Sequence, residues 1–157
     1  MSNAKRRILL KATLAGTAVG VAVGAGLLTP RSVLAAWPKS AFNAKTSDGA
    51  MKELYQGQTA KESADIQVKA PQIAENGAVV PVTIKTSLKD VESIVIIVEK
   101  NKRPLAADFK ITSSARPIVA TRIKVANSSK VTAIVKSGGK LYSAGKDVKV
   151  TIGGCGG

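Results

Sequence analysis

The run Ile94-Val95-Ile96-Ile97-Val98 decides the fold class, because all five of its residues are β-branched and none is polar. β-Branched side chains favour extended backbone over helix. A continuous apolar run of this length is typical of a strand that is covered on both faces of its sheet. The sequence therefore predicts a buried strand over residues 94–98.

Shorter apolar runs with a period of two lie on both sides of this strand, and turn residues separate them. The predicted strands occupy residues 66–70, 80–84, 109–111, 119–125, 131–135 and 148–152. Residues 76–77 are predicted as a turn and residues 137–140 as a hairpin turn. About seven short strands with turns between them indicate an all-β, immunoglobulin-like antiparallel β-sandwich, with a small open barrel as the alternative.

One short N-terminal helix is predicted before the strands, within residues 42–57. Its apolar stripe has the 3–4 spacing of a helix face and consists of Met51, Leu54 and Tyr55. Ser47 or Asp48 is the predicted N-cap, and Gly57 is predicted to end the helix.

The 157-residue chain is long enough for one domain with a hydrophobic core, and it is strongly basic. It contains 24 Lys and Arg, 10 Asp and Glu and no His, which gives a formal charge of +14. Residues 1–35 hold five of the basic groups and no acid, so the rest of the chain carries +9. The lysines are scattered and only five aromatic residues are present, which argues against nucleic-acid binding. The excess charge predicts a solvated basic surface that suits small anions.

Residues 1–35 have the three parts of a bacterial export signal. Arg6 and Arg7 stand in a basic start, an uncharged run covers residues 12–30, and small residues near Ala35 suit a signal peptidase. The paired arginines resemble the twin-arginine signal, which is read by a receptor. The prediction is a cleaved signal peptide and a periplasmic protein that is not held in the membrane. An uncleaved membrane anchor is the alternative.

The sequence offers little chemistry within the predicted sandwich. Without histidine, a metal site or a Cys-His catalytic pair lacks its usual ligand or base, so no metal, no cofactor and no enzymatic activity are predicted. The single cysteine, Cys155, follows the last predicted strand and is flanked by Gly153, Gly154, Gly156 and Gly157. Glycine adopts many backbone conformations, so residues 153–157 are predicted to form a flexible arm with an exposed thiol.

Several stretches of the chain resemble the SoxY family, the sulfur-carrier proteins of bacterial thiosulfate oxidation. The resemblance is carried by the terminal Gly-Gly-Cys-Gly-Gly after a Val-x-Val-x-Ile strand, by Ile-Ala-Glu-Asn-Gly-Ala-Val-Val-Pro-Val at residues 73–82, by Thr-Arg-Ile-Lys at residues 121–124 and by the twin-arginine leader. It covers essentially the whole chain, and the cysteine-bearing tail is its most specific part. The loop Asn-Lys-Arg-Pro at residues 101–104 departs from the family pattern.

The resemblance implies an immunoglobulin-like fold and a heterodimer with a SoxZ-like subunit. It also implies that Cys155 is the site of covalent sulfur attachment and that its four glycine neighbours form a swinging arm. A haem enzyme, SoxAX, would join thiosulfate to Cys155 oxidatively, and a hydrolase, SoxB, would release sulfate and leave a persulfide. In some organisms a sulfane dehydrogenase, SoxCD, then oxidises the remaining sulfur.

The predicted organisation is a signal peptide over residues 1–35, a segment with a short helix over 36–63, a β-sandwich over 64–152 and the arm over 153–157. Two other interpretations stay open. Gly156-Gly157 is also the ending of ubiquitin-like sulfur carriers, which are activated at the terminal carboxylate. A β-sandwich of this kind also fits a structural binding module.

Overall fold

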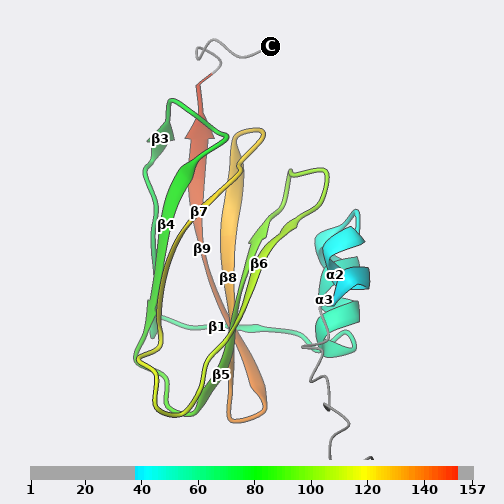
Figure 1. Cartoon of the computed structure of the whole chain (residues 1–157), viewed down its shortest axis with the longest axis vertical. Helices are drawn as coiled ribbons and strands as arrows, with labels where there is room; N and C mark the ends of the chain where they lie inside the picture. The colour runs from blue at the N-terminus through cyan, green and yellow to red at the C-terminus, as the bar shows by residue number, and fades with distance from the viewer. Residues whose placement is uncertain (1–37, 152–157) are drawn as a thin grey trace, which may run out of the picture. The chain divides into compact units, whose positions relative to one another are not determined.

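The computed structural model describes residues 38–151, which form two β-sheets and two short helices (Figure 1). The helices are α2 (Lys39–Asn43) and α3 (Ser47–Tyr55). The strands are β1 (Lys61–Glu62), β2 (Ile66–Lys69), β3 (Ile73–Ala74), β4 (Val80–Thr86), β5 (Val91–Val98), β6 (Leu105–Lys110), β7 (Ile118–Ile123), β8 (Ser129–Ser137) and β9 (Lys140–Val150).

The strands are divided between a larger and a smaller sheet. The larger sheet has six strands in the order β1-β9-β8-β5-β6, with β3 also paired to β9, and the smaller sheet has the order β2-β4-β7. All pairings are antiparallel except those of β1 and β3 with β9, which are parallel. This arrangement confirms the predicted all-β sandwich, and the open barrel considered as its alternative is wrong.

β5 lies in the interior and is covered on both faces, as its apolar run predicted. Ile94, Ile96 and Val98 face the core between the two sheets, whereas Val95 and Ile97 belong to a second cluster that contains the helices. All five side chains are at most 3% exposed. Since burial of one Val or Ile side chain contributes about 1.5–3 kcal/mol, this strand is a major source of stability.

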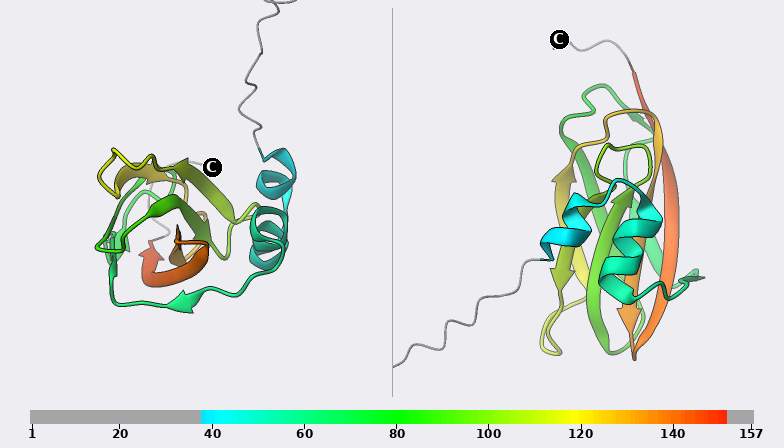
Figure 2. Two further views of the ribbon diagram at one scale, coloured as in Figure 1. Left: turned by 90° about the horizontal axis from the view of Figure 1, so that it is seen from below. Right: turned by 90° about the vertical axis from the view of Figure 1, so that its right-hand side faces the viewer.

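The two helices pack on the outer face of the larger sheet (Figure 2). The predicted helix corresponds to α3, whereas α2 was not predicted, and the extended backbone of Ala44 (φ −57°, ψ 139°) ends α2 before α3 begins. The predicted N-caps were wrong. The cap of α3 is Thr46, whose extended backbone places its hydroxyl oxygen 3.0 Å from the Gly49 amide that donates to it. At the other end, Gln56 already has a left-handed backbone (φ 55°), one residue before Gly57.

The hairpin at residues 137–140 is confirmed, but β9 is much longer than predicted. Gly138 and Gly139 have φ values of +53° and +74°, so they form a tight two-residue turn, with Ser137 paired to Lys140. β9 starts directly at Lys140. Its middle section, residues 143–147, holds small and charged residues that hide the strand pattern. Ile152, predicted to end this strand, lies outside the described residues.

The two-residue strands β1 and β3 were not predicted, since two residues are too short for a periodic pattern. β7 ends at Ile123, two residues before its predicted end. Val125 is nevertheless fully buried, and its amide donates to the carbonyl oxygen of Gly77 at 2.7 Å.

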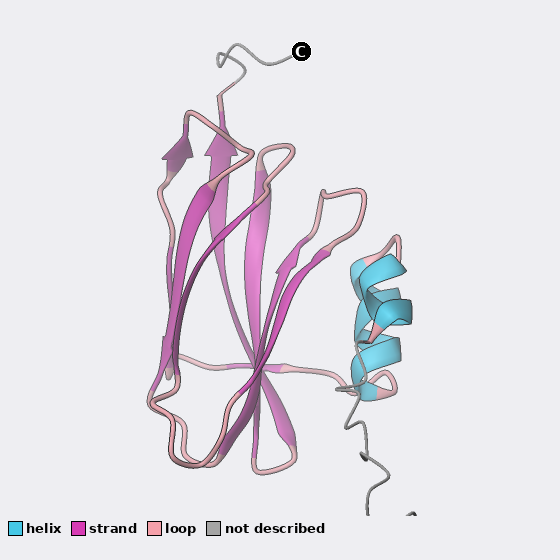
Figure 3. Cartoon of the chain, in the orientation of Figure 1, coloured by secondary structure: helices cyan, strands magenta, loops and turns pink. Residues whose placement is uncertain are grey.

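Figure 3 shows that the β3–β4, β5–β6 and β7–β8 loops gather at the same end of the sandwich as the carboxyl end of β9.

Candidate functional site

The residues predicted to carry the function lie outside the described part of the chain. Cys155, its neighbours Gly153, Gly154, Gly156 and Gly157, and the leader residues Arg6 and Arg7 are among residues 1–37 and 152–157. The structure describes the end of the sandwich from which the cysteine-bearing segment continues. Thr151, the last described residue, is four positions before Cys155.

The carboxyl end of β9 is held from two sides. On one side it pairs with β3, where the Lys149 amide donates to the Gln72 carbonyl oxygen at 2.9 Å and the Thr151 amide donates to the Ala74 carbonyl oxygen at 3.2 Å. On the other side the Val150 amide donates to the Ser128 hydroxyl oxygen at 2.9 Å. The position of Thr151 on the sandwich is therefore well defined.

Gly77 allows the loops beside this strand end to pack closely. A Cβ atom at residue 77 would collide with the Val125 carbonyl oxygen and would lie 2.9 Å from Cγ1 of Val150. The turn before β4 is closed by Asn76, whose side-chain oxygen accepts from the Ala78 amide at 2.9 Å. Glycine is thus required at residue 77 for close approach, and the predicted turn at residues 76–77 is confirmed.

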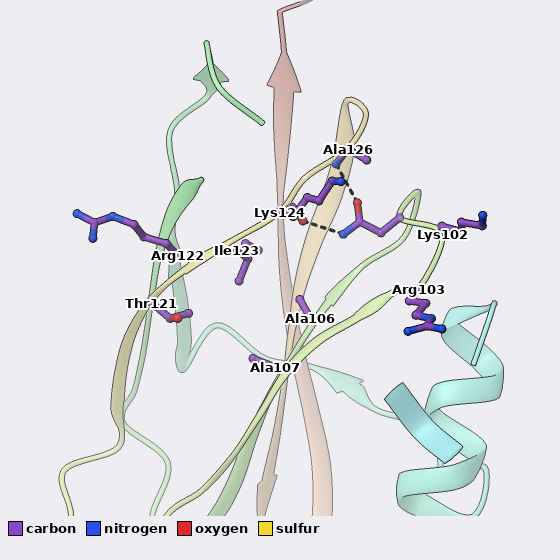
Figure 4. Close-up of a pocket in the computed structure, with 10 residues that line it drawn as sticks. Lys102, Arg103, Ala106, Ala107, Thr121, Arg122, Ile123, Lys124 and Ala126 are labelled. Atoms are coloured by element: carbon purple, nitrogen blue, oxygen red, sulfur yellow. Dashed lines mark hydrogen bonds between the residues drawn. The ribbon is translucent and has the colours of Figure 1, made fainter. Parts of the chain in front are cut away.

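Asn101 joins the β5–β6 loop to the β7–β8 loop. Its side-chain amide donates to the Lys124 carbonyl oxygen at 2.7 Å, and its side-chain oxygen accepts from the Ala126 amide at 2.9 Å (Figure 4). This residue belongs to the loop that departs from the family pattern. Asn101 therefore has a structural role in this loop, which the sequence alone did not reveal.

A shallow groove of about 620 Å³ lies between β6 and β7 at this end of the sandwich (Figure 4). Its apolar part is formed by Ala106, Ala107 and Ile123. Of the ten described residues that line it, four are cationic and none is acidic. The cations are Lys102, Arg103, Arg122 and Lys124.

A second groove of similar size lies between the β4–β5 and β6–β7 connections, and it has a different charge. It measures about 610 Å³ and is lined by Lys89, Asp90 and Glu92 together with apolar and hydroxyl side chains. Anions are therefore favoured at the first groove, where the cations are not offset by acids.

The two side chains with shifted pKa values belong to the framework. Burial raises the pKa of the Tyr55 phenol, whose oxygen lies 3.1 Å from the buried Ser93 hydroxyl beneath α3. The Lys136 ammonium, 2.6 Å away, and the Gly139 amide hold the pKa of Glu92 below its usual range. These contacts stabilise α3 and the β8–β9 hairpin and lie away from the end of β9.

Residues 38–151 offer neither a metal cluster nor a membrane-spanning helix. No group of three or more Cys, Asp or Glu side chains there is arranged to hold a metal ion. Neither helix in this range has the length and hydrophobicity needed to cross a membrane.

Comparison with known proteins identifies the family. A family model described as sulfur oxidation protein SoxY matches residues 51–155. Among solved structures, the sulfur carrier protein SoxY from Chlorobium limicola f thiosulfatophilum is 41% identical, with a TM-score of 0.61 over 67% of this chain and 96% of that chain. A superoxide reductase (neelaredoxin) from Ignicoccus hospitalis is 18% identical, with a TM-score of 0.49 over 55% of this chain and 80% of that chain. No curated protein sequence matches the chain.

The fold, the SoxY family model and the Chlorobium SoxY structure define the chain as a β-sandwich carrier protein of sulfur oxidation. It belongs to the SoxY family. This confirms the resemblance seen in the sequence and links the protein to the sulfur carriers of the Sox system.

Proposed function

We propose that the chain carries the sulfur intermediates of thiosulfate oxidation on the thiol of Cys155. The main support is that the SoxY family match extends through residue 155 and so includes this cysteine. A second support is the secure attachment of β9, whose last residues hydrogen-bond to β3 and to Ser128. Such a strand end gives a segment of glycines a fixed starting point, from which the thiol can reach other proteins.

The proposed chemistry has two steps, and both need a partner enzyme. In the first step, an S–S bond forms between the Cys155 thiol and the outer sulfur of thiosulfate. Two electrons pass to a haem enzyme of the SoxAX type, and the thiol proton is released. In the second step, a hydrolase of the SoxB type adds water, which releases sulfate and a proton and leaves a persulfide on Cys155. The chain has no histidine that could act as a base for the thiol, which favours activation by these partners.

Three further parts of the proposal rest on the sequence and the family. The Arg6-Arg7 leader would direct export to the periplasm by the twin-arginine route. A SoxZ-like subunit would form a heterodimer with the sandwich, and a SoxCD-type dehydrogenase would oxidise the persulfide where it is present. A chain purified from periplasm that still begins at Met1 would contradict the cleaved leader.

The function is tested by intact mass spectrometry of the protein incubated with thiosulfate and a periplasmic extract of a thiosulfate-oxidising bacterium. The expected result is a sulfur-containing adduct that fragmentation places on Cys155 and that is absent from Cys155→Ser. An adduct on the terminal carboxylate of Gly157 would instead support activation of the ubiquitin-like kind. Unchanged thiosulfate oxidation with Cys155→Ser would contradict a carrier role for this thiol.

A further inference from the structure

The turn between β3 and β4 holds the one asparagine of residues 38–151 that is followed by glycine, Asn76-Gly77 (Figure 3). Asparagine is a chemically labile residue, because the amide nitrogen of the next residue can attack its side-chain carbonyl carbon and expel ammonia. A following glycine hinders this attack least, since it has no Cβ. The other asparagines of this range precede alanine, lysine or serine, so Asn76 has the least hindered neighbour.

The hydrogen bonds of this turn leave both reacting groups available. The Asn76 side-chain oxygen accepts from the Ala78 amide at 2.9 Å, which bends the side chain back over the intervening Gly77 peptide. Among the hydrogen bonds of residues 38–151, none has the Gly77 amide or the Asn76 side-chain NH₂ group as its donor. The attacking nitrogen and the leaving group are therefore not held by other contacts.

The Ala78 amide is also placed to stabilise the charge that the attack creates. As the Gly77 nitrogen bonds to Cγ of Asn76, negative charge develops on Oδ1, and the Ala78 N–H already donates to this oxygen. Asn76 and Ala78 are both exposed. Water can therefore take the proton of the Gly77 amide, carry away ammonia and hydrolyse the product.

We propose that Asn76-Gly77 is a deamidation site of the folded protein and that its conversion loosens the carboxyl end of β9. In the first step, the Gly77 nitrogen bonds to Cγ of Asn76, the bond from Cγ to the side-chain nitrogen breaks, and ammonia leaves with the Gly77 proton. In the second step, water opens the cyclic imide at either carbonyl and gives aspartate or isoaspartate. No oxidant, reductant or enzyme is needed.

The two products differ in their effect on the sandwich. Aspartate keeps the backbone and an acceptor for the Ala78 amide. In isoaspartate the main chain runs through the side-chain carbon, which adds one backbone atom directly before Gly77. The packing leaves no room there, because a Cβ atom at residue 77 would collide with the Val125 carbonyl oxygen and would lie 2.9 Å from Cγ1 of Val150. Isoaspartate should therefore disturb the contacts that hold the β7–β8 loop and β9 to this turn.

The test follows conversion in the full, folded chain at pH 8. Samples are digested with trypsin at intervals, and the sample taken at the start corrects for conversion during digestion. The expected result is replacement of NH₂ by OH in peptide 70–85, in which Asn76 is the single asparagine. Peptides 40–45 and 125–130, which contain Asn43 and Asn127, should stay unchanged over the same period. Labelling by an isoaspartate methyltransferase measures the isoaspartate fraction.

Hydrogen exchange measures the structural consequence of the conversion. Cation exchange separates the converted chain, which carries one more negative charge. Its isoaspartate form should exchange faster than the unconverted chain at the Val125 amide, which donates to Gly77, and at the Thr151 amide, which donates to Ala74. Asn76→Asp adds the same charge without an extra backbone atom and should keep slow exchange at both amides. Asn76→Ser cannot form the imide and should show no conversion.

Three results would overturn this inference. Conversion of peptide 70–85 only in chain unfolded by urea would mean that the folded turn prevents the attack. Equal conversion at Asn43 and Asn127 would mean that the turn does not select Asn76. Unchanged exchange at Val125 and Thr151 in the isoaspartate form would mean that the conversion does not loosen β9. None of these measurements involves loading of Cys155, so they leave the proposed carrier function unaffected.

Discussion

Gly77 shows at the scale of one residue how the end of β9 is fixed. The β3–β4 turn, the β7–β8 loop and β9 approach one another at this glycine because it has no side chain. Its carbonyl oxygen also accepts the Val125 amide. The packing requirement at residue 77 is therefore steric.

The substitution Gly77→Ala should lower the free energy of unfolding by about 1–3 kcal/mol, because the added methyl group must displace the Val125 carbonyl or the Val150 side chain. Urea denaturation measures the loss. Hydrogen exchange should accelerate at the Thr151 amide, which bonds to Ala74.

Gly57→Ala is the comparison for this variant, because a Cβ atom there meets nothing within 4 Å and the strain comes only from a φ of +81°. Gly57→Ala should lower the free energy of unfolding by about 1–2 kcal/mol without affecting hydrogen exchange at the Thr151 amide. Equal exchange rates at Thr151 in the two variants would contradict the steric role of Gly77.

Asn101 is a second single residue on which the loops of this end depend. Asn101→Ala removes both hydrogen bonds to the β7–β8 loop and should cost about 1–2 kcal/mol, with faster hydrogen exchange at the Ala126 amide. Asn101→Asp keeps the acceptor for that amide and loses the donor to Lys124. The Ala126 amide should therefore stay protected from hydrogen exchange in the aspartate variant and lose this protection in the alanine variant. Loss of protection in both variants would argue against the Asn101 side-chain oxygen as the acceptor.

At the scale of elements, α3 is fixed to the larger sheet by a buried polar contact as well as by apolar packing. Tyr55 and Ser93 are 8% and 2% exposed, and their oxygen atoms lie 3.1 Å apart. Neighbouring apolar side chains of α3, β5 and β8 belong to the same cluster. The helix is therefore a cover for Val95 and Ile97 rather than a separate unit.

Tyr55→Phe should lower the free energy of unfolding by about 1–2 kcal/mol at pH 8, because the buried Ser93 hydroxyl loses its hydrogen-bond partner. The variant should also change the alkaline stability profile. Burial raises the pKa of the Tyr55 phenol above its ordinary value of 10.0, so the contribution of this group to stability is complete below that pH and is lost as pH rises through the folded pKa.

Urea denaturation between pH 8 and pH 11.5 checks this sign. The unfolding free energy of the wild type should fall more steeply above pH 10 than that of Tyr55→Phe. Tyr142→Phe keeps Tyr55 and should retain the steeper fall. Parallel profiles for wild type and Tyr55→Phe would show that ionisation of Tyr55 is not linked to unfolding.

Elements with a clear residue pattern were predictable from the sequence, and the others were not. β5 has an unbroken β-branched run, and the β8–β9 hairpin has two glycines that favour positive φ. β9 was predicted only at its end, because its partners β8 and β1 stabilise a middle section whose own residues have no strand pattern. The cap at Thr46 was missed because Ser47 and Asp48 are equally good caps by residue type.

At the scale of the whole molecule, the strands that form the sandwich and the segment that is proposed to carry sulfur are separate in sequence. The cysteine was recognisable from its glycine neighbours and from the family match through residue 155. The groove was not recognisable, because it is lined by residues of β6, of β7 and of the loops beside them, which are separate in the sequence. Only the fold places its cations and alanines together.

This separation predicts the effect of removing residues 153–157. The described strand β9 ends at Val150, and the Thr151 amide still bonds to Ala74 in the shortened chain. The free energy of unfolding of the unloaded protein should therefore change by no more than about 0.5 kcal/mol, the usual range for surface changes. Loading with sulfur from thiosulfate should be abolished, as in Cys155→Ser.

The comparison of the shortened chain with Cys155→Ser locates the function on the segment. Both should retain the wild-type urea midpoint and both should fail to support thiosulfate oxidation in a reconstituted periplasmic extract. Normal oxidation by the shortened chain would favour a structural binding module, because the sandwich would then be sufficient. A large fall in its urea midpoint would mean that residues 153–157 stabilise the unloaded sandwich, and the proposed division between a stable handle and a separate carrier segment would be wrong.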